Sequence, residues 1–213
     1  MRKIIDNDVN LNWQIYPTKE VAKYYKKNKN FSNIVSTLNS WQSENINDFI
    51  TSLYFLKLGD FFCENLLSSY ELKNNRGANL FLLLAYEEDV LVGAIILNNQ
   101  SQNISEDFKL ADNIDNLRIE YIVVNPDKQN MGVGTRMIKS IINNQKTLSN
   151  YKPINGITTD IDNENTASQK AFLKNNFKIV MPPSYLCKYF SRYYFTTKRP
   201  YRPSDITEEE KDI

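Results

Sequence analysis

The sequence predicts an α/β (α+β) fold, in which helices flank a central mixed sheet of about seven strands. Three observations predict it. The chain of 213 residues can bury one sizeable core, and 41% of its residues are hydrophobic. Aromatic residues make up 12%, which argues against wholesale disorder. The predicted elements run strand, several helices, hairpin, then strands and helices in alternation. We expect one domain over residues 1–200, with its core at 78–198, and a polar tail at 201–213.

The N-terminal part is predicted to begin with a strand and to continue as a helical elaboration of the domain. The alternating stretch 11–17 indicates the strand. Thr18 then caps a helical pattern that runs out in polar residues before Phe31. Residues 46–68 are apolar at helical spacing, and Gly59 either splits them into two helices or marks close packing.

A β-hairpin is predicted over residues 78–99, where two apolar runs flank the acidic turn Glu87-Glu88-Asp89. A solvated turn is the ordinary interpretation of these acids, and attraction of a cationic acceptor is the alternative. The polar stretch 98–116 that follows is a surface loop or an extension of the hairpin.

The C-terminal half is predicted to alternate strands and helices. A strand over 117–126 ends at Pro126, because proline cannot donate to the ladder. An amphipathic helix over 135–148 follows the two glycines after this strand. The remaining predicted elements are a strand at 155–162, a helix at 163–177, a strand at 177–181 and a last strand at 192–198.

Composition excludes several kinds of site. The chain has no histidine, which excludes a histidine triad, a histidine general base and most zinc sites. Cys63 and Cys187 lie in apolar or aromatic stretches outside any CxxC, as expected of buried thiols. A net charge of +1 gives no indication of a nucleic-acid partner. The polar N-terminus and the absence of a long apolar run predict a cytoplasmic protein without a membrane partner.

Residues 123–134 read VVNPDKQNMGVG and contain Gly132 and Gly134, two of the 6 glycines in the chain. A strand that enters a helix through Gly-x-Gly presents backbone N–H groups at the positive end of the helix dipole. Phosphate or pyrophosphate is the natural partner of such a loop. The third glycine of a dinucleotide fingerprint and the Gly-Lys-Ser/Thr of a Walker A loop are both absent. By itself, the pattern therefore leaves a tight turn as the alternative.

The wider window, residues 122–138, resembles the acetyl-CoA-binding signature of the GNAT superfamily of N-acyltransferases. That signature has Val-x-Pro, a basic residue or Gln, two variable residues, Gly, one variable residue and Gly or Ala. The matching residues are Val124, Pro126, Gln129, Gly132 and Gly134. A second family motif follows in the family's order, with Asn165, Ser168, Phe172, Asn176 and Phe177 at its offsets. The close resemblance covers residues 117–181.

The resemblance implies an acetyl-CoA-dependent N-acetyltransferase that transfers the acetyl group directly to an amine. Loop N–H groups would hold the CoA pyrophosphate, and the end of the strand would pair with the pantetheine amides. A backbone N–H at Val124 or nearby would donate to the thioester oxygen. Asn165 would bind pantetheine or cap its helix. The implied cofactor-binding residues are Ile122, Val123, Val124, Gln129, Asn130, Met131, Gly132, Val133, Gly134, Thr135 and Asn165.

Many family members carry a glutamate general base in the strand that holds Glu120. A carboxylate desolvated in a cleft can have a raised pKa, as a base for an amine requires. The alternative is an ion pair with Arg118, which lies on the same face of the strand.

The residue that would protonate the leaving thiolate is in doubt, because Phe172 stands where many members have a tyrosine. A thiolate is a tolerable leaving group near neutral pH. Other proton donors from the C-terminal segment are Tyr185, Tyr189 and Tyr194, with aromatic packing as the alternative for each.

The acceptor is expected to be an amine-bearing small molecule or a peptide, and acetyl-CoA the cosubstrate, with no metal and no nucleic acid involved. Two other functions stay open. One is a non-catalytic acyl-CoA-binding or regulatory module on the same fold. The other is acetylation of a macromolecule such as a protein N-terminus. The sequence leaves both monomer and homodimer open.

Overall fold

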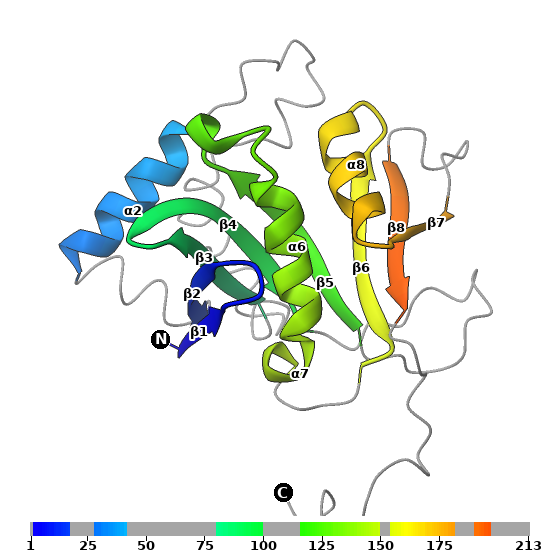
Figure 1. Ribbon diagram of the computed structural model, residues 1–213, viewed down its shortest axis with the longest axis horizontal. Coiled ribbons are helices and arrows are strands. Elements are labelled where there is room, and N and C mark those ends of the chain that lie inside the picture. The colour runs from blue at the N-terminus through cyan, green and yellow to red at the C-terminus, as the bar shows by residue number, and fades with distance from the viewer. Residues whose placement is uncertain are drawn as a thin grey trace, which may run out of the picture. The chain divides into compact units, whose positions relative to one another are not determined.

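The computed structural model describes residues 2–17, 28–41, 80–99, 116–149, 154–181 and 190–196. Its strands form one mixed sheet in the hydrogen-bonded order β1-β2-β3-β4-β5-β6-β8-β7 (Figure 1). The predicted α/β class is confirmed. Among the described residues the sheet has eight strands rather than about seven, because Arg2–Asp6 forms β1, which the polar N-terminal sequence did not indicate.

Some expectations lie outside the described residues. These are the helical patterns after Thr18 and over 46–68, most of the polar stretch 98–116, and the tail 201–213. The residues Gly59, Cys63, Cys187, Tyr185 and Tyr189 lie outside as well.

The chain forms two compact units. The first consists of Met1–Asn98 with Tyr121–Met137, and the second of Asn99–Glu120 with Ile138–Ile213. Both β5 (Asn116–Val124) and α6 (Val133–Asn143) are therefore divided between the units.

Antiparallel strands build the sheet of the first unit. They are β1 (Arg2–Asp6), β2 (Leu11–Pro17), β3 (Leu80–Glu87) and β4 (Val90–Asn98). The predicted hairpin is confirmed, and its turn places Glu88 in the left-handed region with a φ of 52°. Consecutive residues of β3, Leu82 to Ala85, are buried, so both faces of this strand are covered.

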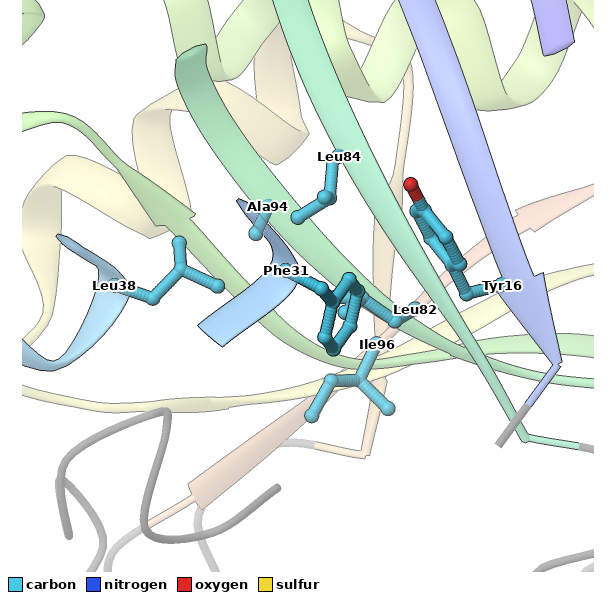
Figure 2. Packing of buried hydrophobic residues seen from close by; sticks show 7 residues of the cluster. All are labelled: Tyr16, Phe31, Leu38, Leu82, Leu84, Ala94 and Ile96. Atoms are coloured by element: carbon cyan, nitrogen blue, oxygen red, sulfur yellow. The ribbon is translucent and has the colours of Figure 1, made fainter. Parts of the chain in front are cut away.

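One face of the first unit packs against α2 (Lys29–Ser40), as Figure 2 shows. The Phe31 ring lies 5.0 Å from the Tyr16 ring, measured between centroids. The prediction that helical structure runs out before Phe31 was wrong. The Asn28 side chain accepts hydrogen bonds from the Asn30 and Phe31 N–H groups and starts a helix there. The buried cluster consists of Tyr16, Phe31, Leu38, Leu82, Leu84, Ala94 and Ile96.

The opposite face of β4 lies against the first turns of α6. A Cβ atom added to Gly93 would lie 2.5 Å from Met137 Sδ and 2.8 Å from the Val123 carbonyl oxygen. Glycine is therefore required at this position so that helix and strand can approach closely. Met137 itself is fully buried.

In the second unit, β6 (Gly156–Asp162) pairs in parallel with β5 and antiparallel with β8 (Phe190–Thr196). The short strand β7 (Lys178–Met181) pairs antiparallel with β8. The helix predicted over 135–148 begins two residues earlier, at Val133, and is divided into α6 and α7 (Gln145–Leu148). The division lies at Asn144, whose Nδ2 donates to the Ser140 carbonyl at 3.0 Å.

Helix α8 (Thr166–Lys174) has a defined cap at each end and lies in front of β6 in Figure 1. Asn165 caps its start, accepting a hydrogen bond from Ser168 N–H at 3.0 Å. At its end Asn176 has a φ of 64°, Asn176 N–H donates to the Leu173 carbonyl, and Phe177 N–H donates to the Phe172 carbonyl. These bonds define a Schellman motif, completed by the edge-to-face contact of Phe172 and Phe177 at 4.9 Å.

Candidate functional site

The two glycines after β5 have different structural roles. Gly132 has a φ of 76°, and a Cβ added to it would meet no atom within 4 Å. Gly134 lies in the first turn of α6, and a Cβ there would lie 3.5 Å from Val124 Cγ2, an ordinary contact. Gly132 is therefore needed for its backbone conformation, whereas position 134 has room for alanine. This difference explains why the family signature allows Gly or Ala at the second position.

The loop presents a row of backbone donors at the start of α6. Arg136 N–H donates to the Gly132 carbonyl at 3.0 Å, which is the first hydrogen bond of the helix. In the described part of the chain, the N–H groups of residues 130–134 donate no hydrogen bond. The side chains of Gln129, Asn130 and Met131 are exposed. Free N–H groups at the positive end of a helix dipole, with open space above Gly132, suit an oxyanion such as a diphosphate.

Gln129 differs from the residues that follow it. It ends the short 3₁₀ helix η3 (Pro126–Lys128), and its backbone N–H donates to the Pro126 carbonyl at 3.2 Å. Its side chain, rather than its backbone, is therefore the part of Gln129 that is available to a ligand.

Both ends of the loop are attached to the β3–β4 hairpin. Before the loop, Asn125 N–H donates to the Val92 carbonyl at 2.9 Å, and Asn125 Nδ2 donates to the Leu91 carbonyl at 3.2 Å. After it, the Arg136 guanidinium forms an ion pair with Glu87 and donates to the Val9 carbonyl at 3.3 Å.

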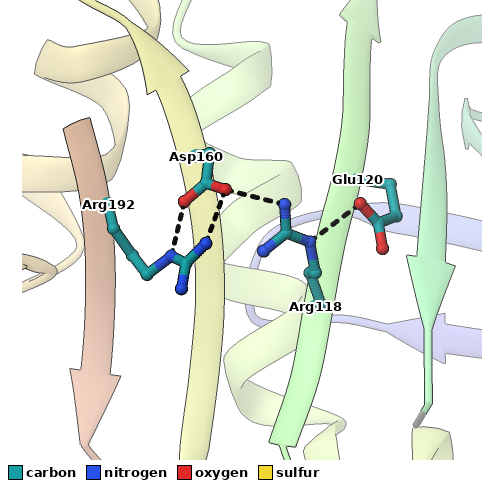
Figure 3. A network of polar contacts seen from close by, with 4 residues as sticks. All are labelled: Arg118, Glu120, Asp160 and Arg192. Atoms are coloured by element: carbon teal, nitrogen blue, oxygen red, sulfur yellow. Dashed lines mark hydrogen bonds and ion pairs between the residues drawn. The ribbon is translucent and has the colours of Figure 1, made fainter. Parts of the chain in front are cut away.

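Glu120 lies in the second unit and belongs to a network of four charged side chains (Figure 3). Arg118 Nε donates to Glu120 Oε2 at 2.8 Å, and Arg118 Nη2 donates to Asp160 Oδ2 at 2.8 Å. Arg192 makes two hydrogen bonds to Asp160, of 2.7 and 3.0 Å. The ion pair between Glu120 and Arg118, considered from the sequence as an alternative to the base role, is thus present. The side chains of Arg118 and Glu120 are 19% and 22% exposed.

The network changes the pKa values of two of its members. Burial would raise the pKa of Asp160, but the hydrogen bonds and charges of Arg192 and Arg118 outweigh it and lower this pKa below its ordinary value. Burial would lower the pKa of Arg118, but the Glu120 and Asp160 carboxylates raise it instead. Asp160 therefore stays ionised at neutral pH and holds both guanidinium groups.

The second motif is largely accounted for by helix caps. Asn165 and Ser168 form the N-cap of α8, and Phe172, Asn176 and Phe177 form its Schellman end. Asn176 replaces the family's glycine because asparagine tolerates the left-handed conformation. Phe172 is fully buried and packs against Phe177, so it serves the core. Contact of Asn165 with pantetheine stays a prediction.

Among the predicted proton donors, Tyr194 is the one that the structure describes. Its ring lies against Gly156, where an added Cβ would be 2.6 Å from the Tyr194 Cζ atom. Burial raises the pKa of the Tyr194 hydroxyl, which therefore keeps its proton at neutral pH.

The predicted site residues divide between the two units. Ile122 to Val124 and Gln129 to Thr135 belong to the first unit, and Glu120, Asn165 and Tyr194 belong to the second. Sequence reasoning missed Arg136, Asp160 and Arg192. Their partners lie on other strands or turns, so local spacing gave no signal for the contacts.

Residues 43–177 match the family model described as the acetyltransferase (GNAT) family, over more than half of the chain. The chain belongs to the GNAT family. The resemblance inferred from the sequence is thereby confirmed, as is the enzyme class. This GNAT protein is an N-acetyltransferase, and acetyl-CoA is its cosubstrate.

Solved structures support the GNAT fold at low sequence identity. A ribosomal-protein-S5-alanine acetyltransferase from Vibrio fischeri matches with a TM-score of 0.50 and 12% identity, covering 95% of this chain and 100% of that one. A GNAT family acetyltransferase from Listeria monocytogenes 4b F2365 matches with a TM-score of 0.50 and 13% identity, over 92% and 100% of the chains. A putative acetyltransferase of the GNAT family from Desulfovibrio desulfuricans matches with a TM-score of 0.51 and 10% identity, covering 87% of this chain and 98% of that one. No curated protein matches the sequence.

The described residues contain no group of three or more His, Cys, Asp or Glu side chains arranged to hold a metal ion. None of the described helices combines the length and apolar character needed to cross a bilayer.

Proposed function

We propose that this GNAT protein transfers an acetyl group from acetyl-CoA directly to an amine, and that residues 129–135 bind the CoA diphosphate. The observation that carries the proposal is the loop between β5 and α6, where Gly132 is left-handed and the N–H groups of residues 130–134 donate no hydrogen bond within the described part of the chain. Family membership supplies the identity of the anion.

The remaining cofactor contacts in the proposal come from Ile122, Val123, Val124 and Asn165. The end of a strand can pair its backbone with the amides of pantetheine as an added strand does. Val124 lies on β5 directly before Asn125, where the loop begins. The cap bond of Asn165 uses its side-chain oxygen, so within the described part of the chain its N–H₂ group is left for such a contact.

Glu120 is the proposed general base. In the reaction the amine nitrogen bonds to the thioester carbonyl carbon, the carbon–sulfur bond breaks, CoA leaves as its thiolate, and the amine proton goes to Glu120 directly or through water. Arg118 holds one carboxylate oxygen of Glu120. Tyr194 is the described candidate for protonating the thiolate, since its hydroxyl keeps its proton at neutral pH.

The acceptor is proposed to be the amine of a peptide or of a small molecule. One structural neighbour, the Vibrio fischeri enzyme, is named for an alanine of a ribosomal protein. Its 12% identity supports the fold alone, so both kinds of amine belong in a screen.

A ligand screen followed by an activity assay tests the proposal. Acetyl-CoA and CoA should raise the melting temperature, whereas pantetheine, which lacks the diphosphate, should raise it less at equal concentration. Free CoA thiol is then measured over a panel of small amines and peptides. Equal shifts with CoA and pantetheine would contradict diphosphate binding by the loop. Binding without thiol release from any amine would instead indicate a protein that binds acyl-CoA without acetyl transfer.

A further inference from the structure

We infer that Asn125 and Arg136 are positioning residues that clamp the two ends of the diphosphate loop to the β3–β4 hairpin. The inference rests on the proposed function, since it concerns how the loop is held for its anion. All of its contacts lie within the first compact unit.

At the end of the loop, Arg136 makes contacts with two different turns. Its Nη2 forms the ion pair with Glu87, the last residue of β3, and its Nη1 donates to the carbonyl of Val9, which lies between β1 and β2. The side chains of Arg136 and Glu87 are 32% and 23% exposed, so the pair is partly shielded from solvent. A guanidinium can make both contacts at once because its donors form a rigid fork.

At the start of the loop, Asn125 uses both its backbone and its side chain. Its N–H and Nδ2 donate to Val92 and Leu91, which begin β4. Its Oδ1 accepts a hydrogen bond from Asp127 N–H at 3.0 Å, which shapes the first turn of η3. The Asn125 side chain therefore joins the loop to the hairpin and also shapes the first turn of the loop.

The backbone between the two clamps has an unusual conformation, which the clamps help to keep. Asn130 and Gly132 both have left-handed φ values, 61° and 76°. Asparagine tolerates this conformation better than most residues do, but it is still less favourable than the right-handed one, so contacts at both ends help to keep it. If either end moved, the backbone N–H groups proposed to bind the diphosphate would change position. Loss of a clamp should therefore reduce diphosphate binding and leave pantetheine binding unchanged.

A different role for Arg136 predicts the opposite sign for one variant. If the guanidinium bound the diphosphate directly, Glu87 would compete for it, and Glu87→Gln would tighten CoA binding. If Arg136 acts as a clamp, Glu87→Gln removes its anchor and weakens CoA binding. In that case the effects of Glu87→Gln and Arg136→Met on CoA affinity should be non-additive, since each variant breaks the same contact.

The experiment is a double-mutant cycle on the full chain, with dissociation constants for CoA and pantetheine measured by calorimetry. Arg136→Met, Glu87→Gln and Asn125→Ala should each weaken CoA binding about tenfold, as expected for losing a hydrogen bond to a charged or half-buried group. The double variant Glu87→Gln/Arg136→Met should bind CoA no more weakly than whichever of its two single variants binds CoA more weakly. Pantetheine affinity should not change. Arg136→Lys should recover part of the loss, because lysine can pair with Glu87.

Lys139→Met is the matched control, since it removes the same charge from an exposed position of α6 and should leave CoA binding unchanged. Melting temperatures of the unliganded variants check that each one folds. Tighter CoA binding by Glu87→Gln, or equal losses for CoA and pantetheine, would overturn the clamp. Failure of the wild type to bind CoA would refute the proposed function itself, and the clamp with it.

Discussion

The loop after β5 and the charged network on β5, β6 and β8 differ in the groups that they offer, backbone in the first and side chains in the second. The loop offers backbone N–H groups, and its side chains serve mainly to hold that backbone. The network of Arg118, Glu120, Asp160 and Arg192 consists of side chains from three strands. The proposed anion site depends on side chains only through the position of its backbone. In the network of paired charges, by contrast, loss of any one side chain leaves its partners without a hydrogen-bonded counter-charge.

Glu120→Gln should have the largest effect, and it tests the side-chain region. Glutamine keeps the shape of glutamate but cannot accept the amine proton, so kcat should fall about 100-fold at neutral pH. CoA affinity should stay unchanged, because the loop residues are untouched. Steady-state kinetics and calorimetry measure the two quantities, with Glu88→Gln, at the exposed turn, as control. Unaltered turnover would refute the base role.

Asp160→Asn should have the next largest effect. It leaves two guanidinium groups without their shared carboxylate, so the free energy of unfolding should fall by about 1–2 kcal/mol, allowing for partial exposure. Because Arg118 also holds Glu120, kcat should fall as well, while CoA affinity should not. Urea unfolding and CoA titration of the same variant check both expectations. A weaker affinity for CoA would show that the two regions are coupled.

Gly132→Ala and Gly134→Ala form a matched pair for the backbone region. Alanine at position 132 must hold a φ of 76°, so CoA binding should weaken about tenfold. Alanine at position 134 makes only an ordinary contact with Val124 and should bind CoA as well as the wild type does. Titration calorimetry distinguishes them. Equal CoA affinities of the two variants would mean that Gly132 is not required for its backbone conformation.

The smallest expected effect is a pH dependence of stability that belongs to the network alone. The pKa of Asp160 is lowered in the folded protein, so its stabilisation is fully present above the unfolded pKa of about 3.9. It is lost as the pH falls through the lower folded-state pKa. The difference in melting temperature between wild type and Asp160→Asn should be constant from about pH 7 to 5 and shrink below about pH 4. A difference that grows with falling pH would contradict this assignment.

Residues close together in the chain were the ones that sequence reasoning placed well. The hairpin around Glu87 to Asp89, the start of α8 at Asn165 and the loop at Gly132 all follow from local rules of turns, caps and φ angles. The helix over Lys29–Ser40 was missed because its cap, Asn28, is one of several asparagines in a polar run. The strand β1 was missed because pairing with β2, rather than an apolar pattern of its own, defines it.

The sequence by itself determined the fold class, the GNAT resemblance and the Gly132 loop that we propose for the CoA diphosphate, because backbone conformation is encoded by neighbouring residues. Only the tertiary structure decided that Arg118 joins Glu120 to Asp160 and that Arg136 reaches Glu87 and Val9. Those contacts join residues up to 127 positions apart. Such pairings arise from the register of strands and the packing of helices, which local sequence patterns do not specify.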